Sequence, residues 1–212
     1  MPYYPVFLDL TGKKCLVVGG GAVAERKIKS LLEYGARVQV VSPTLTGALQ
    51  ELVKQGRVNH RAGRYRASDL NGVFLAVSAT DDDLTNQAVS KDCAARNIMV
   101  NVVDKPDRCS FIVPSVVHRG PLQIAVSTSG KSPHLARIIR EKLESQFGNH
   151  FAEFVSFLGE MREQVKKNEA DAGKRKSVLN NLVDEKTFQL LQQGDIEKAK
   201  ERVKRACTGS GG

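Results

Sequence analysis

Three consecutive glycines, in a segment that reads CLVVGGGAVAER over residues 15–26, are the part of this chain with the clearest chemical use. Gly19, Gly21 and Ala24 fit the fingerprint G-x-G-x-x-A. In it, the first small residue permits a tight turn, the second lets the backbone approach a pyrophosphate, and the third allows close packing of helix on strand. A glycine-rich loop can also merely connect a strand to a helix. The apolar run before it and the amphipathic pattern after it favour a dinucleotide site, with the positive helix end facing the phosphates.

A carboxylate at the end of another apolar run is the second group that could do chemistry. Asp104 follows the run IMVNVV of residues 98–103. At the carboxyl end of a parallel strand it could accept a proton from a substrate nitrogen or carbon, or coordinate a metal. An Asp before Lys105 and Pro106 is equally expected as a turn former. Asn101, inside the run, needs a partner for its amide, because a buried unpaired polar group costs free energy.

The end of the second expected strand lacks the acidic residue that often binds the adenosine ribose, about 20 residues after the glycines. Ser42, Pro43 and Thr44 stand there instead. Their hydroxyl and backbone groups could still hold the ribose. Arg37 precedes the strand end and is not interpreted as a clamp for a 2′-phosphate, so we expect NAD rather than NADP.

Thr80 opens a TDDD segment after the fourth expected strand. Asp82 and Asp83 are interpreted as an N-cap and an acidic first turn of the next helix, because carboxylates stabilise the positive helix end. Thr80 and Asp81 could in addition line a cofactor crevice.

A polar loop later in the chain, STSGKSP over residues 127–133, could bind a carboxylate or a phosphate. Its hydroxyl groups and ammonium belong to Ser127, Thr128, Ser129 and Lys131. The loop lacks the G-x-x-x-x-G-K-[ST] form of a P-loop. Capping of a helix that starts near Ser132, with Pro133 in its first position, is an equally natural explanation.

Strand and helix patterns alternate along the first half of the chain. We expect strands at residues 14–18, 37–41, 58–62, 72–77 and 98–103. We expect helices at residues 23–34, 46–55 and 84–96. This alternation predicts an α/β fold with a doubly wound parallel sheet of Rossmann type. Right-handed crossovers then bring Gly21, Ser42, Thr80 and Asp104 to one crevice.

The pattern changes after residue 107. Residues 110–114 and 122–127 have the character of strands, and residues 134–147 form a strong helical pattern. From residue 150 onward the segment is charged, amphipathic and helical.

Composition restricts the classes of partner. The apolar runs are too short to span a bilayer and the N-terminus lacks a signal peptide, so we expect no membrane partner and a cytoplasmic location. Four scattered cysteines and four unpaired histidines favour neither a zinc site nor any other fixed metal site. The net charge of +9 suggests an acidic ligand, and a diffuse basic surface is the plainer alternative. No helix-turn-helix or basic arm is present, so we expect no nucleic acid partner.

Four motifs carry a family resemblance. In order along the chain they are GGGAVAERK, SATDDDLTN, NVVDKPDRCSFIVPS and VSTSGKSPHLARIIREKLE. With them the chain resembles the precorrin-2 dehydrogenase/sirohydrochlorin ferrochelatase family, both its stand-alone form and the N-terminal half of siroheme synthases, over about residues 6–162. The resemblance implies three parts. They are an NAD-binding Rossmann domain (1–113), a small α+β dimerisation domain (114–147) and a helical C-terminal domain (148–207). The composition of residues 208–212, TGSGG, predicts a flexible tail.

The same resemblance implies residue roles. Asp104 matches the catalytic aspartate, credited with a part in dehydrogenation and in iron insertion, and at most a transient contact of Fe²⁺. The positions that match NAD contacts are Gly21, Ala22, Val23, Ser42, Pro43 and Thr44, and the Gly19 turn and Thr80 are expected beside them. The expected substrate contacts are Asn101, Ser127, Thr128, Ser129 and Lys131. Some relatives carry a regulatory phosphoserine where this chain has Thr128, and the methyltransferase domain of the fused enzymes is absent, so no methylation is assigned.

The resulting hypothesis is NAD-dependent oxidation of precorrin-2 to sirohydrochlorin by a homodimer, with Fe²⁺ insertion as a second activity. A polycarboxylate tetrapyrrole is a polyanion that a basic protein could attract. A dehydrogenase without chelatase activity is the first alternative. A regulator that senses NAD(H) and binds DNA is a distant one.

Overall fold

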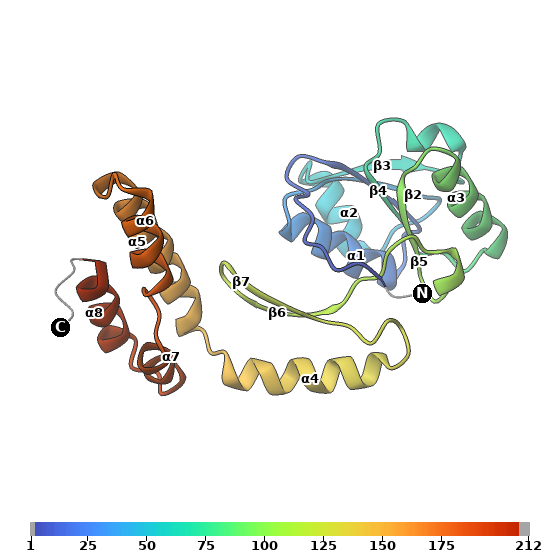
Figure 1. Cartoon of the computed structure of the whole chain (residues 1–212). Coiled ribbons are helices and arrows are strands. Elements are labelled where there is room, and N and C mark those ends of the chain that lie inside the picture. The colour runs from blue at the N-terminus through green and yellow to red at the C-terminus, as the bar shows by residue number, and fades with distance from the viewer. Residues whose placement is uncertain (1–2, 208–212) are drawn as a thin grey trace. The chain divides into compact units, whose positions relative to one another are not determined.

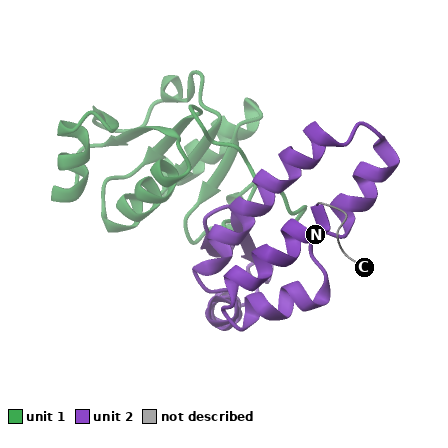
Figure 2. Cartoon of the chain, turned by 90° about the vertical axis from the view of Figure 1, so that its left-hand side faces the viewer, with its two compact units in different colours: residues 1–113 green, residues 114–212 purple. Residues whose placement is uncertain are grey.

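The computed structural model describes residues 3–207 and divides the chain into two compact units. Unit 1 is Met1–Val113 and unit 2 is Pro114–Gly212 (Figure 2). The flexible tail expected at 208–212 lies outside the described residues. The further division of unit 2 into a dimerisation and a helical domain stays a prediction.

Unit 1 is built on a five-stranded parallel sheet in the order β3-β2-β1-β4-β5. Its strands are β1 (Lys14–Val18), β2 (Arg37–Ser42), β3 (Val58–Ala62), β4 (Leu75–Ser78) and β5 (Met99–Val102). Val18 pairs with Val41 on one side and with Ser78 on the other, so the strands end level with one another. From β1, the strands β2 and β3 extend to one side of the sheet, and β4 and β5 extend to the other. Ligands of sheets of this kind bind beside the point between β1 and β4 where this order reverses. The predicted α/β doubly wound fold is confirmed.

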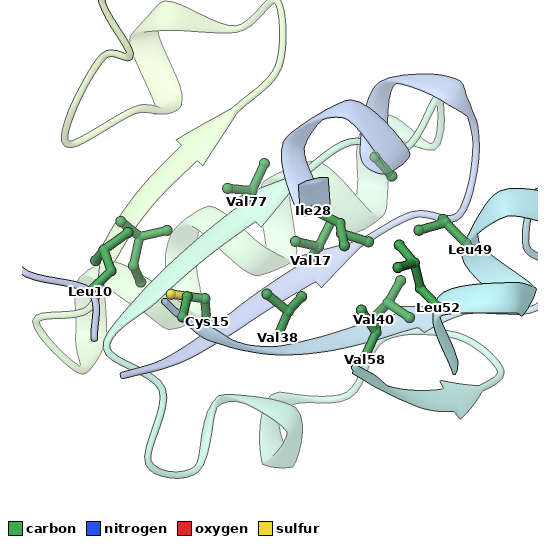
Figure 3. Close-up of a cluster of buried hydrophobic side chains, with 13 residues drawn as sticks. Leu10, Cys15, Val17, Ile28, Val38, Val40, Leu49, Leu52, Val58 and Val77 are labelled. Carbon is green, nitrogen blue, oxygen red and sulfur yellow. The ribbon is translucent and has the colours of Figure 1, made fainter. Parts of the chain in front are cut away.

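Helices cover both faces of this sheet, as Figure 1 shows. One face carries α1 (Ala22–Glu33) and α2 (Gly47–Lys54), whose buried Ile28 and Leu49 pack on valines of the central strands (Figure 3). The other carries α3 (Asp83–Ala95) and the 3-10 turn η1 (Ala67–Leu70). Strands buried on both sides must be apolar throughout, which explains their runs of valine and leucine.

Side chains cap two of these helices, and one of the two caps was predicted from the sequence. The Thr46 hydroxyl accepts a hydrogen bond from Leu49 N at 3.2 Å and begins α2. Asp82 is the N-cap of α3 and accepts from Leu84 N at 3.1 Å, while Asp83 stands in the first turn. The capping interpretation of Asp82 and Asp83 is therefore confirmed.

Two expected strands need correction. The strand expected at 72–77 is Leu75–Ser78, because Gly72 adopts a left-handed conformation (φ +69°) and forms a turn before it. The strand expected at 110–114 is wrong. That segment lies along β5 through Ser110, whose N–H and hydroxyl bond Val100, but forms no ladder, and the next strand begins only after Pro114, which lacks an N–H.

Unit 2 begins with an antiparallel hairpin of β6 (Ser115–Arg119) and β7 (Leu122–Val126). Ser132 caps α4 (Pro133–Gln146) by accepting from Leu135 N at 3.2 Å, with Pro133 in the first turn as the capping alternative predicted. Four further helices follow: α5 (His150–Asn168), α6 (Ala172–Asn180), α7 (Glu185–Gln192) and α8 (Ile196–Cys207). Phe151, Phe154 and Leu191 are buried among them and form a separate core. Among residues 3–207, no helix has the length and apolar character needed to cross a membrane.

Candidate active site

Backbone hydrogen bonds join the carboxyl ends of four of the five strands of unit 1, β2, β1, β4 and β5. Gly19 N donates to Val41 O at 2.9 Å, Ala79 N donates to Val18 O at 2.7 Å, and Val103 N donates to Ser78 O at 3.0 Å. The loops that follow β1, β2, β4 and β5 therefore start side by side. Four predicted residues lie at this one edge of the sheet. Ser42 ends β2, and Gly21, Thr80 and Asp104 belong to the loops after β1, β4 and β5.

The three glycines have different surroundings in the turn between β1 and α1. Gly19 is left-handed (φ +119°), and a Cβ there would overlap the carbonyl of Ala79. A Cβ on Gly20 would overlap the carbonyl of Thr44 and lie 2.8 Å from Ser42 Oγ. A Cβ on Gly21 would meet nothing within 4 Å. The first two glycines thus serve internal packing, and Gly21 presents its bare backbone to open space.

Helix α1 differs from its neighbours at its first turn. Its N-cap, Gly21, has no side chain that could accept from the free N–H groups, and no described side chain caps them. Glu25, an acid in this first turn, is held by Lys29 Nζ at 2.5 Å and by Thr46 Oγ1 at 2.7 Å, and both bonds lower its pKa. Ala22 and Val23, the first residues of this turn, are exposed, and uncapped N–H groups at a helix start are suited to binding a phosphate.

The end of β2 separates the three residues predicted to contact the cofactor there. Ser42 is buried, its hydroxyl lies beside Gly20, and its carbonyl lies 3.0 Å from His60 Nε2. Pro43 and Thr44 are exposed. These two residues offer the accessible surface at this strand end, and Ser42 supports the turn beneath it.

A buried polar pair fixes the loop after β4. Ser78 Oγ donates to Asn86 Oδ1 at 2.7 Å, and Asn86 Nδ2 donates to the carbonyl of Thr80 at 2.9 Å. Both Ser78 and Asn86 are buried. Asn86 is not among the residues predicted from the sequence, although an amide on the buried face of a helix was a usable signal.

Asp104 stands two residues after the end of β5, exposed to solvent and in a left-handed conformation (φ +58°). Its loop is closed from within by Cys109, whose sulfur accepts from Val102 N at 3.2 Å. Asn101 Nδ2 donates to Phe111 O at 3.1 Å, so its amide nitrogen has the partner that its position requires. Asp104 therefore has the turn conformation expected of a turn-forming residue. It also has the exposed carboxylate expected of a group that exchanges protons with a ligand.

The polar loop predicted to contact substrate belongs to unit 2. Ser129 N donates to Ser127 Oγ at 3.0 Å, and Ser132 N donates to Thr128 Oγ1 at 3.0 Å. Ser129 is left-handed (φ +54°), and both it and Lys131 are exposed. Two of the hydroxyl oxygens therefore shape the loop itself, while the side chains of Ser129 and Lys131 remain open to a ligand.

No group of three His, Cys, Asp or Glu side chains within the described residues is arranged to hold a metal ion. All four cysteines are free thiols, and burial raises the pKa of Cys15 and of Cys93 to about 11. These two thiols therefore keep their protons at neutral pH, and both side chains are part of the hydrophobic core.

Comparisons with known proteins cover both units. A family model described as "Putative NAD(P)-binding" matches residues 6–115. Models described as "Sirohaem biosynthesis protein central" and "Sirohaem synthase dimerisation region" match residues 119–146 and 150–206.

Relatives match over nearly the whole chain. Siroheme synthase of Photobacterium profundum is 41% identical over 96% of this chain and 43% of its own length. That of Methylobacillus flagellatus is 38% identical over 100% of this chain and 45% of its own. The chain therefore spans less than half the length of these curated relatives.

A solved structure described as "SirC, precorrin-2 dehydrogenase" is 30% identical, with a TM-score of 0.75 over 94% of this chain and 100% of that one. The resemblance inferred from four sequence motifs is confirmed by these matches. The chain belongs to a family of siroheme-biosynthesis proteins that includes precorrin-2 dehydrogenase and the siroheme synthases.

Proposed function

We propose that the chain oxidises precorrin-2 to sirohydrochlorin with NAD as the hydride acceptor. The observation that carries this proposal is the placement, at one edge of the sheet, of an uncapped helix start at Gly21 and an exposed carboxylate at Asp104. The first suits a dinucleotide, and the second suits proton transfer beside it. The likeness to a precorrin-2 dehydrogenase structure along nearly all of both chains supports the choice of substrate.

Different residues of unit 1 would bind the cofactor and accept the proton. Gly21 and the N–H groups of the first turn of α1 hold the pyrophosphate, and the accessible Pro43 and Thr44 contact the ribose. When bound, NAD supplies the acceptor for a hydride that leaves a ring carbon. Asp104 accepts the proton that leaves a ring nitrogen as the new double bond forms. The substrate thereby loses one hydride and one proton.

The choice of NAD over NADP rests on the end of β2. No basic side chain follows Ser42 directly, and the guanidinium of Arg61, on neighbouring β3, is bound to Asp69 at 2.5 Å. A 2′-phosphate would therefore find no free cation from these residues. We expect kcat/KM to be higher with NAD than with NADP, and the reverse order would contradict the assignment.

The decisive assay supplies purified protein with precorrin-2 and NAD. The expected result is NADH formation in step with the appearance of sirohydrochlorin. Asp104→Ala should lose turnover and still enhance the fluorescence of bound NADH. Absence of NADH with the wild-type protein would overturn the proposed dehydrogenase activity.

We propose Fe²⁺ insertion into sirohydrochlorin as a second activity of the same site. The macrocycle nitrogens supply the ligands, so the protein needs a base for the N–H protons, and Asp104 is the exposed carboxylate at this edge. Incubation of sirohydrochlorin with Fe²⁺ should be faster with wild-type protein than without it, and Asp104→Ala should remove the difference. Equal rates with and without protein would refute the chelatase activity and leave a dehydrogenase alone.

We also propose that the chain acts as a homodimer. In unit 2, helix α4 exposes Leu135, Ile138 and Ile139 on adjacent positions of its surface, and neighbouring exposed apolar side chains favour a protein interface. The match of residues 150–206 to a region described as "Sirohaem synthase dimerisation region" lies after α4 and supports the homodimer itself, without pointing to α4. Light scattering should give the mass of two chains for wild type and of one for Ile138→Glu. A monomeric wild type would contradict the proposal.

A further inference from the structure

Lys27 occupies an unusual position on α1. Its neighbours Ala24 and Ile28 are fully buried against the sheet, so Lys27 stands at the margin of the packed helix face and is itself half-buried. Val103 and Phe111, from the segment around Asp104, pack against the same core cluster. Helical side chains lean toward the helix N-terminus, so a long lysine here reaches back about one turn, toward the ligand edge of the sheet.

The ammonium of Lys27 has no partner among residues 3–207: it makes neither a hydrogen bond nor an ion pair there. It lies close enough to the Asp104 carboxylate and to Cys109 for electrostatic interaction. Burial lowers its pKa, the adjacent Arg26 lowers it further, and Asp104 opposes both. Two cations that follow one another, one of them half-buried, are unfavourable near a positive helix end unless an anion joins them.

Two anions of the proposed reaction could supply this partner. The pyrophosphate of the cofactor belongs at the first turn of α1, beside Gly21, where the free N–H groups lie. Lys27 stands in the second turn, within electrostatic reach of Asp104, where the proposed proton transfer takes place. A carboxylate of the tetrapyrrole therefore fits Lys27 better than a phosphate does.

We propose that the Lys27 ammonium binds a side-chain carboxylate of the tetrapyrrole and so holds the macrocycle with a ring nitrogen facing Asp104. This assignment rests on the proposed function and deepens it, because it names a binding residue of the same site. The ion pair forms only when substrate is present. It orients the ring without taking part in bond breaking, so Lys27 is a positioning residue.

The test uses uroporphyrin III, a stable polycarboxylate porphyrin, as the probe, and the full-length Lys27→Met, Lys27→Arg and Lys54→Met variants. Lys54 lies on α2, exposes three quarters of its side chain and serves as the matched control for loss of one positive charge. Fluorescence titration should show about tenfold weaker binding of uroporphyrin to Lys27→Met, equivalent to about 1.4 kcal/mol. Lys27→Arg and Lys54→Met should stay within about threefold of wild type. Circular dichroism verifies that each variant is folded.

A second set of measurements separates positioning from other roles. With precorrin-2 and NAD, Lys27→Met should raise KM by more than it lowers kcat, because the variant loses a substrate contact and part of the alignment of the ring with Asp104. NADH affinity should not change. Weaker NADH binding would mean that Lys27 binds the cofactor phosphates. A loss confined to kcat would mean that Lys27 acts on the Asp104 carboxylate and does not bind the substrate. Either result overturns the proposal, as does an equal loss in Lys54→Met.

The proposed dehydrogenase activity and the proposed role of Lys27 are contradicted by different results. If wild-type protein forms no NADH from precorrin-2, the proposed function fails whatever the titrations show. If wild type turns over and Lys27→Met binds uroporphyrin like wild type, the function stands and the role of Lys27 is refuted.

Discussion

The sulfur of Cys109 lies 3.2 Å from the carbonyl oxygen of Lys105 and closes the loop that carries Asp104. The same sulfur accepts from Val102 N, so both ends of the turn are bound to one side chain. Burial raises the pKa of the Cys109 thiol, which therefore keeps its proton at neutral pH and can donate it to a carbonyl. The left-handed conformation of Asp104 is thus held in place from behind, away from the exposed carboxylate.

We predict from this relationship that Cys109→Ala lowers kcat by about tenfold while NADH affinity stays unchanged, because the Asp104 carboxylate loses its fixed direction. Cys109→Ser should recover part of the rate, since a hydroxyl can donate to the same carbonyls. Steady-state kinetics and NADH titration measure both effects. If Cys109→Ala lost NADH binding and activity together, the thiol would be a general structural residue.

Asp104 itself should show a conflict between stability and activity. A left-handed residue with a Cβ is strained by up to about 1 kcal/mol relative to glycine. We therefore expect Asp104→Gly to keep or slightly raise the free energy of unfolding and to abolish turnover, whereas Asp104→Ala abolishes turnover and retains the strain. Urea unfolding and the NADH assay check the pair. A Gly variant that is both active and more stable would remove Asp104 from the chemistry.

Adjacent glycines should respond in opposite ways to a single added carbon. Gly21→Ala should fold like wild type and bind NADH at least about tenfold more weakly, because its methyl group enters open space where the phosphates would lie. Gly20→Ala should destabilise the protein by about 1–3 kcal/mol, since its methyl group overlaps the Thr44 carbonyl. Thermal unfolding and NADH fluorescence distinguish the two. Equal stability of the two variants would contradict this description of the turn.

The buried pair of Ser78 and Asn86 supports the Thr80 loop, and its removal should be measurable. Asn86→Ala leaves the Ser78 hydroxyl and the Thr80 carbonyl without their partner, at a cost of about 1–3 kcal/mol in the free energy of unfolding. Asn86→Asp keeps the acceptor for Ser78 but cannot donate to Thr80 when ionised. It is expected to be destabilised as well, with weakened NADH binding. Wild-type stability in both variants would show that this pair contributes nothing.

Acid should weaken the helical part of unit 2 through Asp184, the N-cap of α7. Its carboxylate accepts from Thr187 Oγ1 at 2.6 Å and from Thr187 N at 2.8 Å, and pairs with Arg202, so its pKa is far below its usual range. A lowered folded-state pKa means that the stabilisation is complete above the unfolded-state value of about 3.9 and is lost as the pH falls toward the folded-state value.

We accordingly expect Asp184→Ala to lower the free energy of unfolding by about 1 kcal/mol at neutral pH. The difference from wild type should shrink below about pH 4, where the wild-type carboxyl begins to protonate. Asp184→Asn, which keeps an oxygen acceptor, should lose less. Denaturant titrations at neutral and acidic pH provide the measurement, and a difference that does not change with pH would contradict the role of the charge.

The fold of unit 1 could be predicted from the sequence to a large extent. Strands at residues 14–18 and 58–62 were predicted with the bounds that the structure has, because each is a short apolar or alternating run between turn residues. The strand expected at 110–114 failed, since its residues have strand character but are bound to β5 at Ser110 and through the Asn101 side chain rather than by a ladder. Local patterning cannot show whether an extended segment finds a complete ladder.

For the site, the sequence by itself determined the residue types and their order: a glycine turn before a helix, Thr80 after β4 and Asp104 after β5. Periodicity and the rule for parallel sheets suffice to place these at one edge. Only the tertiary structure decided that the Thr44 carbonyl leaves room for no side chain at Gly20 and that Cys109 closes the Asp104 loop. It also decided that Lys27 lies within electrostatic reach of that loop and, among residues 3–207, makes neither a hydrogen bond nor an ion pair. Each of these depends on segments distant in the sequence meeting at atomic distances, and that is fixed by how the helices pack on the sheet.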